Sequence, residues 1–269
     1  MNITFKSIFS SITYVFIFLG CFFLMKNIPS LSPPVMLVIE YSSYVTFGVG
    51  IILSIRFNQG RVFLIILLLF LSQLFLNYYE KLSISTTAFS EVLYPLMCLL
   101  VPLNIVIISL LKERGIFSLW GKIRIALIVT QLIVVYMLTI SNHSSIQKVV
   151  NYKYIGSLFD NPIVNQTALV LFLFTLIFLI IKAVMKSSVF DARLVGVILS
   201  IFTALLFVQD KLSFSIFLSA TGLMLIIGVI EDSYSMAYVD ELTGIPSRRA
   251  LRENLMKLGN KYVIAMIDI

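Results

Sequence analysis

The sequence predicts an all-α polytopic membrane protein of about eight transmembrane helices, followed by the first helix and strand of an α/β unit. Its mean hydropathy of +1.03 and its 59% share of hydrophobic residues are far above those of soluble proteins. Only 12% of residues are charged, where soluble chains have about a quarter. Residues 236–269 alone have the composition of a water-soluble domain.

Apolar stretches that approach the length needed to cross a hydrocarbon core of about 30 Å occur along residues 1–230, which we interpret as a membrane sensor domain. We expect helices at residues 7–25, 35–55, 62–78, 92–111, 125–140, 164–184, 194–209 and 214–230. The third, fifth and seventh of these are short, so they must stand upright or the bilayer must thin around them.

Lysine and arginine are divided unevenly between the two sets of connections. The set that includes the amino terminus carries Lys6, Arg56, Arg61, Lys112, Arg114, Lys122, Arg124, Lys182, Lys186 and Arg193. The other set carries Lys26, Lys81, Lys148, Lys153 and Lys211. By the positive-inside rule, both termini of this multi-pass protein lie in the cytoplasm. The net charge of +7 is explained by these loops, and we expect no nucleic-acid partner.

Several polar side chains lie inside the apolar stretches, where an ionisable group is costly and calls for a reason. One interpretation is an outward-open sensor cavity for a small polar or cationic molecule, formed by Glu40, Asn77, Asn104, Gln131 and Gln166. The other is that the amides bond neighbouring helices together and that the carboxylate reaches water at the interface. Trp120 is expected to be an aromatic anchor at the membrane surface.

A capped helix and an apolar run follow the last stretch. Ser247 predicts the N-cap of a helix over residues 248–258, and Gly259-Asn260 predicts its end. Residues 262–267 are apolar and lead to Asp268, which is typical of a strand buried on both faces. Ligands of open α/β sheets gather at the carboxyl edge of such strands.

The segment Asp240-Glu241-Leu242-Thr243-Gly244-Ile245-Pro246-Ser247-Arg248-Arg249 resembles the D-x-L-T-G-L-x-N-R-R signature that opens the GGDEF domain of diguanylate cyclases. Ile245 and Ser247 are conservative departures from it. The resemblance implies that residues 240–269 are the N-terminal fragment of an α/β GGDEF (nucleotide cyclase-like) domain and that residues 231–239 are a helical linker. The family's Gly-Gly loop and guanine-reading residues do not occur in the sequence, so we expect no catalytic residue in it and no cyclase activity by itself.

The same resemblance implies sites and partners. The carboxylate of Asp268 and the backbone carbonyl of Ile269 would begin a Mg²⁺ site. The family condenses two GTP molecules to cyclic di-GMP across two facing domains, which implies GTP as substrate and a homodimer, here through helix 227–239. The signature turn is expected to have a structural or coupling role between the incoming helix and the domain. It is formed by Asp240, Leu242, Thr243, Gly244, Arg248 and Arg249.

The sequence therefore predicts the membrane sensor or regulatory part of a diguanylate cyclase. The alternative is a polytopic transporter or a small-molecule-binding membrane protein whose tail resembles the signature by chance. A third interpretation is a degenerate regulator that senses and binds partners without catalysis.

Overall fold

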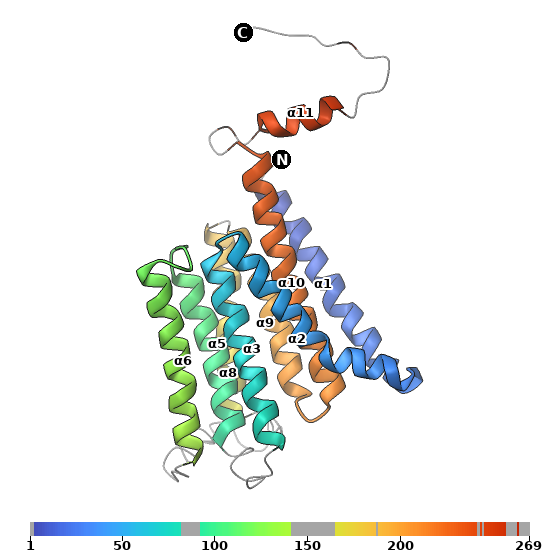
Figure 1. The fold of residues 1–269 in the computed structure, drawn as a ribbon, viewed down its shortest axis with the longest axis vertical. Helices are drawn as coiled ribbons and strands as arrows, with labels where there is room; N and C mark the ends of the chain where they lie inside the picture. The colour runs from blue at the N-terminus through green and yellow to red at the C-terminus, as the bar shows by residue number, and fades with distance from the viewer. Residues whose placement is uncertain are drawn as a thin grey trace.

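The computed structural model describes residues 3–81, 92–140, 165–186, 188–240, 243, 245–256 and 263. Within these ranges the elements are α1 (Ile3–Lys26), the 3-10 turn η1 (Ile28–Ser30), α2 (Pro33–Arg56), α3 (Gly60–Lys81), α5 (Tyr94–Leu110), α6 (Leu119–Ile140), α8 (Gln166–Lys186), α9 (Val189–Leu206), α10 (Lys211–Tyr238) and α11 (Arg248–Met256). All but η1 and α11 form an upright bundle, with α11 lying beyond one end of it (Figure 1).

Six helices, rather than the predicted eight, are long and apolar enough to cross a membrane within the described ranges, and the chain is a membrane protein on this evidence. They are α2, α3, α6, α8, α9 and α10, whereas Ile12–Lys26 of α1 and Tyr94–Leu110 of α5 are shorter apolar helices. Pro95 occupies the first turn of α5, where its missing N–H costs nothing. The 17 residues of α5 rise about 26 Å, less than a hydrocarbon core of about 30 Å.

The predicted α/β unit at the end of the chain is wrong for the described residues, which contain no strand. Val263 belongs to no strand and is 95% exposed, and the rest of the expected strand lies outside the described residues. The single β contact is an isolated antiparallel bridge between Val239 and Pro246, which closes a turn. A buried strand needs a neighbouring strand to bond its backbone N–H and C=O groups. The bridge between Val239 and Pro246 is too short to provide such a neighbour for residues 262–267.

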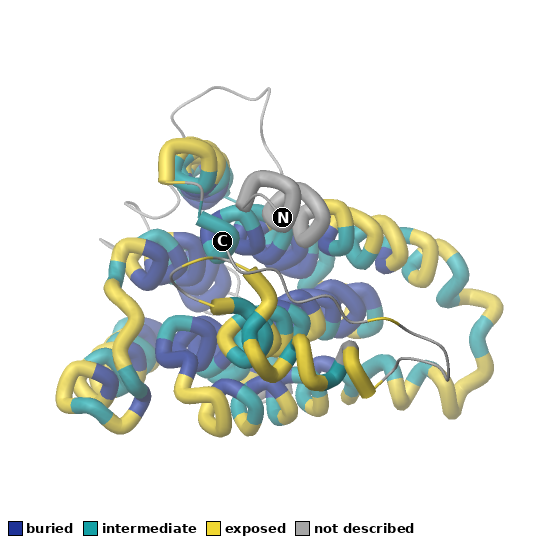
Figure 2. Tube along the Cα trace, turned by 90° about the horizontal axis from the view of Figure 1, so that it is seen from above, coloured by how far each residue is buried: buried dark blue, intermediate teal, exposed yellow. Residues whose placement is uncertain are grey.

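The central helix of the bundle is α10, which packs against α1, α2, α3 and α9. Small residues let α2 and α10 approach closely, as in other membrane helix pairs. A Cβ atom on Gly222 of α10 would lie 2.6 Å from Oγ1 of Thr46, and one on Gly50 of α2 would lie 2.8 Å from Cδ1 of Ile66 in α3. Buried segments face the bundle interior in Figure 2, and exposed segments form its rim.

Successive long helices run in opposite directions, so the basic connections meet at one end of the bundle. At this end α2 joins α3, α5 joins α6, α8 joins α9, and α10 leaves the bundle; α1 also begins there (Figure 1). We call it the basic end, because Arg56, Arg61, Arg114, Arg124 and Lys186 lie near these connections. The opposite end holds Lys26 and Lys211.

Replacing Gly222 with Ala is expected to destabilise the bundle, because the added Cβ would also lie 2.9 Å from Cβ of Thr46, forcing α10 and α2 apart. Overpacking of this kind costs about 1–3 kcal/mol. Thermal unfolding of the purified protein in detergent measures the change. Gly48→Ala is the matched control, because a Cβ at Gly48 of α2 would meet nothing within 4 Å. Equal Tm values for the two variants would contradict the close contact.

Candidate functional site

A buried arginine ties α10 to its neighbour at the point where α10 leaves the bundle. The side chain of Arg193 in α9 is 6% exposed and donates to Glu231 at 2.8 Å and to Asp232 at 2.7 Å, both in α10. It also donates to the backbone carbonyl of Gly228 at 3.3 Å. Charge-assisted hydrogen bonds to two carboxylates compensate the guanidinium for its lost hydration. The direction in which α10 exits is therefore fixed by α9.

The residues of the signature turn follow α10 directly. Oδ1 of Asp240 accepts from the backbone N–H of Thr243 at 2.9 Å and from its hydroxyl at 2.7 Å. The backbone N–H of Asp240 donates to the carbonyl of Ile245 at 2.9 Å. Asp240 and Thr243 thus shape the turn from within, whereas Leu242 and Gly244 lie outside the described residues.

Helix α11 is held against the end of α10 by polar and aromatic contacts. The hydroxyl of Tyr238 donates to Glu253 of α11, and the guanidinium of Arg249 lies 5.3 Å from the centre of the Tyr238 ring. Ser247, the predicted N-cap, instead donates its hydroxyl to the carbonyl of Ala237 at 3.2 Å. Arg248 begins α11. Two elements of the signature region, the turn and α11, therefore depend on the last turn of α10.

The predicted metal ligands Asp268 and Ile269 lie outside the described residues. Within the part of the chain that the structure describes, no group of three or more His, Cys, Asp and Glu side chains is placed to hold a metal ion.

The five polar residues of the predicted sensor cavity lie in three separate places. Glu40 and Asn77 share a cavity of about 70 Å³ at the end opposite the basic end, near Lys211. Asn77 donates to the hydroxyl of Tyr44, and the carbonyl of Glu40 accepts from Ser215 at 3.0 Å. A water occupies about 30 Å³ of liquid, so this cavity admits water or a group of similar size.

The amide residues lie elsewhere. Gln166 is buried at the first position of α8 and lines neither this cavity nor the pocket described next. Asn104 of α5 donates to the side-chain oxygen of Gln131 in α6 at 2.9 Å and to the carbonyl of Leu100 at 2.8 Å. This pair bonds two helices, as the alternative interpretation of the buried amides expects.

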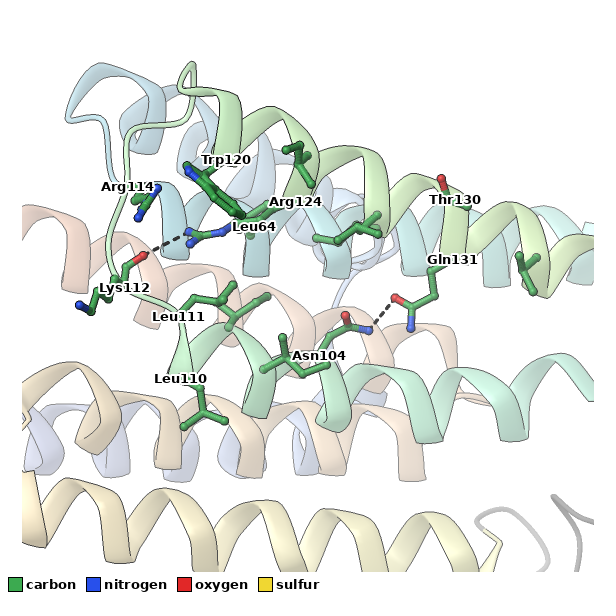
Figure 3. A pocket seen from close by; sticks show the side chains of 16 residues that line it. Leu64, Asn104, Leu110, Leu111, Lys112, Arg114, Trp120, Arg124, Thr130 and Gln131 are labelled. Carbon is green, nitrogen blue, oxygen red and sulfur yellow. Dashed lines mark hydrogen bonds between the residues drawn. The ribbon is translucent and has the colours of Figure 1, made fainter.

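The Asn104–Gln131 pair closes the inner part of a pocket of about 730 Å³ between α5 and α6, with Leu64 of α3 at its back (Figure 3). The volume is that of a small-molecule site. Helix α6 stands at the edge of the bundle in Figure 1, and its main helix contact is with α3. The space between α5 and α6 is left open because they are joined by an extended connection, residues 111–118.

That connection is fixed by contacts with the turn between α2 and α3. The carbonyl of Arg114 lies so close to Gly60 that a Cβ there would be 2.2 Å from it. Arg61 pairs with Glu113 at 2.7 Å, and Oδ1 of Asn58 accepts from the backbone N–H of Ile116 at 3.0 Å. The residues at the outer mouth of the pocket, Lys112, Arg114, Trp120 and Arg124, are held on this frame (Figure 3).

Sequence reasoning missed both the Arg193 cluster and the pocket. The charge pattern places Arg193 in a connection, although the acidic pair Glu231-Asp232 directly after the last apolar stretch offers a partner at the same depth. The signal for the pocket is the face of α6 that carries Trp120, Arg124, Leu127, Gln131 and Val134 at helical spacing.

No protein-family model matches the chain, and no curated protein or solved structure matches it significantly. The resemblance of residues 240–249 to the GGDEF signature therefore rests on that segment.

Arg193→Gln is expected to loosen the exit of α10, because each lost charge-assisted hydrogen bond contributes about 1.5–3 kcal/mol before water recovers part of it. Amide hydrogen exchange over residues 228–238 should become faster by roughly tenfold or more. Arg56→Gln is the matched control, since Arg56 is an exposed cation at the end of α2. Unchanged exchange in Arg193→Gln would show that the cluster does not hold α10.

Proposed function

We propose that the chain is the membrane sensor or regulatory part of a diguanylate cyclase, the enzyme class that condenses two GTP molecules to cyclic di-GMP. The observation that carries the proposal is the continuity of α10. One helix runs from the bundle core through Tyr238 and leads directly into the segment 240–249 that resembles the GGDEF signature. A displacement of α10 inside the bundle is therefore transmitted to that segment without an intervening flexible linker.

The contacts at both ends of the exposed part of α10 support a coupling role. The ion pairs of Arg193 hold its base, and the contacts of Tyr238 with Glu253 and Arg249 hold its tip to α11. A helix held in this way passes on a rotation or a shift as a rigid body. The regulatory event is then a movement of α9 and α10 together, relative to the rest of the bundle, that reorients the signature turn.

A homodimer through helix 227–239 is part of the proposal, because the reaction joins nucleotides held on two facing copies. The expected seam of this dimer has the spacing of a two-stranded coiled coil and consists of Ile227, Ile230, Tyr234 and Ala237. Ile230 and Tyr234 are 51% and 61% exposed in the single chain. Both lie where α10 has left most of its neighbours, so burying them against a second copy would remove apolar surface from water.

We further propose that the basic end faces the cytoplasm of a bacterial-type inner membrane, where GTP is found. Single cysteines test this, because native Cys21 and Cys98 are buried. Ser32→Cys, at the opposite end, should react with an impermeant maleimide in intact cells. Phe117→Cys, 70% exposed at the basic end, should react only after lysis. The reverse pattern would place the signature turn outside, away from GTP.

A version of the chain that is extended beyond Ile269 through a complete cyclase domain is expected, in isolated membranes, to form cyclic di-GMP from GTP and Mg²⁺. Asp268 and the carbonyl of Ile269 are the proposed ligands of the ion, which neutralises phosphate charge. Asp268→Asn should lower product formation by roughly 100-fold or more, because an amide oxygen carries no charge. Asp210→Asn is the matched control, since Asn also caps a helix and Asp210 lies at the far end of α10. No product from the extended version with Asp268 intact would contradict the proposal.

The pocket between α5 and α6 favours a second candidate function, that of a transporter or a small-molecule-binding membrane protein. Its volume of about 730 Å³ is large enough to bind a small molecule, and such binding would not require the protein to act on nucleotides. Ligand binding, with no cyclic di-GMP formed by the extended version, would favour this alternative.

A further inference from the structure

The pocket between α5 and α6 changes character along its length, from cationic to apolar. Its mouth at the basic end is formed by Lys112, Arg114 and Arg124 beside Trp120. Aliphatic side chains of α3, α5 and α6 line the middle, among them Leu64, Ile107, Ile108 and Leu127. A ligand that matches this surface has an anionic head and an apolar chain.

The cations at the mouth have no acidic partner among the described residues. Arg114 lies over the ring of Trp120, with 5.0 Å between its Cζ atom and the ring centre, and Arg124 donates to the carbonyl of Lys112 at 3.2 Å. Glu113, the acid in the same connection, is instead bound by Arg61. The two guanidinium groups are thus oriented by neutral contacts, and their charge is available to an anion.

The length of the apolar section corresponds to one leaflet. Ile123 beside the mouth and Val134 at the inner end, the first and last aliphatic residues of α6 that line the pocket, are separated by roughly 16 Å along α6, at about 1.5 Å per residue. Half of a hydrocarbon core is about 15 Å. One turn before the inner end, the side-chain amide of Asn104 is satisfied by Gln131 and by the carbonyl of Leu100, so an apolar chain passes bonded amides there.

We propose that this pocket binds one anionic phospholipid from the leaflet at the basic end, with its phosphate between Arg114 and Arg124 and one acyl chain between α5 and α6. A soluble phosphate would leave the apolar section empty, and a zwitterionic lipid would bring a choline cation as well as its phosphate to a mouth that is already cationic. The proposal concerns binding alone and does not depend on the cyclase activity. It does not require the basic end to be cytoplasmic.

Trp120 makes the test direct, because it is the single tryptophan of the chain and stands at the pocket mouth. The full chain is reconstituted in phosphatidylcholine vesicles that contain a small fraction of a lipid with brominated acyl chains. The brominated lipid is phosphatidylglycerol in one series and phosphatidylcholine in the other. Bromine quenches tryptophan fluorescence on contact. Each sample is compared with the same lipid without bromine, which removes effects of the protein variant on intrinsic fluorescence. Quenching at lower mole fractions by phosphatidylglycerol is expected, and equal quenching by both lipids would overturn the proposal.

Substitutions then separate the pocket from general surface charge. Arg114→Gln and Arg124→Gln should each weaken the preference for phosphatidylglycerol by about fivefold, the usual contribution of one basic residue near an anionic lipid. Lys122→Gln is the matched control, since Lys122 is an exposed cation of α6 that does not line the pocket. An equal loss in Lys122→Gln would show attraction to the membrane surface only and would overturn the proposal.

Two further measurements identify the occupant. Leu127→Phe narrows the apolar section without changing charge, so it should reduce quenching by brominated phosphatidylglycerol while circular dichroism stays unchanged. Inorganic phosphate at millimolar concentration should not relieve the quenching. Relief by phosphate would identify a soluble anion as the ligand, and unaltered quenching in Leu127→Phe would exclude a chain between α5 and α6; either result overturns the proposal.

Discussion

The need to pair a buried guanidinium determines how the rest of this structure is arranged. Arg193 lies inside the bundle in α9, where an uncompensated charge would cost several kcal/mol, and Glu231 and Asp232 compensate it from α10. These acids lie in the last three turns of α10, where the helix leaves the bundle. The pairing therefore fixes the depth of α10 in the bundle, its rotation about its own axis and the direction in which it continues beyond the membrane.

The position of α10 then determines the packing around it. Gly222 faces Thr46, and a side chain there would prevent α2 from approaching α10. A second buried pair, Lys182 with Asp191 at 2.8 Å, joins α8 to α9 at the same end. Helix α6 takes part in neither arrangement, and the pocket arises beside it. The bundle thus has a closely packed centre around α10 and a looser edge.

Sequence patterns predict the helices well because each apolar run must form its backbone hydrogen bonds internally in lipid. They predict the number of membrane-length helices less well, since α5 has 17 residues and falls just short of membrane length, a limit that nothing in hydropathy marks. The pairing of Asn104 with Gln131 is a tertiary contact between neighbours that no periodicity encodes. The apolar residues before Asp268 predict a strand only if partner strands exist, and the described chain provides none. Local sequence signals therefore predict the helices, whereas the Arg193 cluster and the pocket depend on how neighbouring helices pack in three dimensions.

The turn between α2 and α3 connects the edge of the bundle to its centre. Gln59 donates to the carbonyl of Val229 in α10 at 3.3 Å, close to the ion pairs of Arg193. On its other side, Asn58 and Arg61 hold the connection that carries the pocket mouth, the latter through Glu113. Asn58 has a φ of 54°, a conformation that Asn tolerates better than most residues. The turn can therefore contact α10 through Gln59 and the connection between α5 and α6 through Asn58. Arg114 and Arg124 lie on or beside this connection. The same short turn therefore positions the pocket mouth and bonds the end of α10, although α6 and α10 themselves belong to the edge and the centre of the bundle.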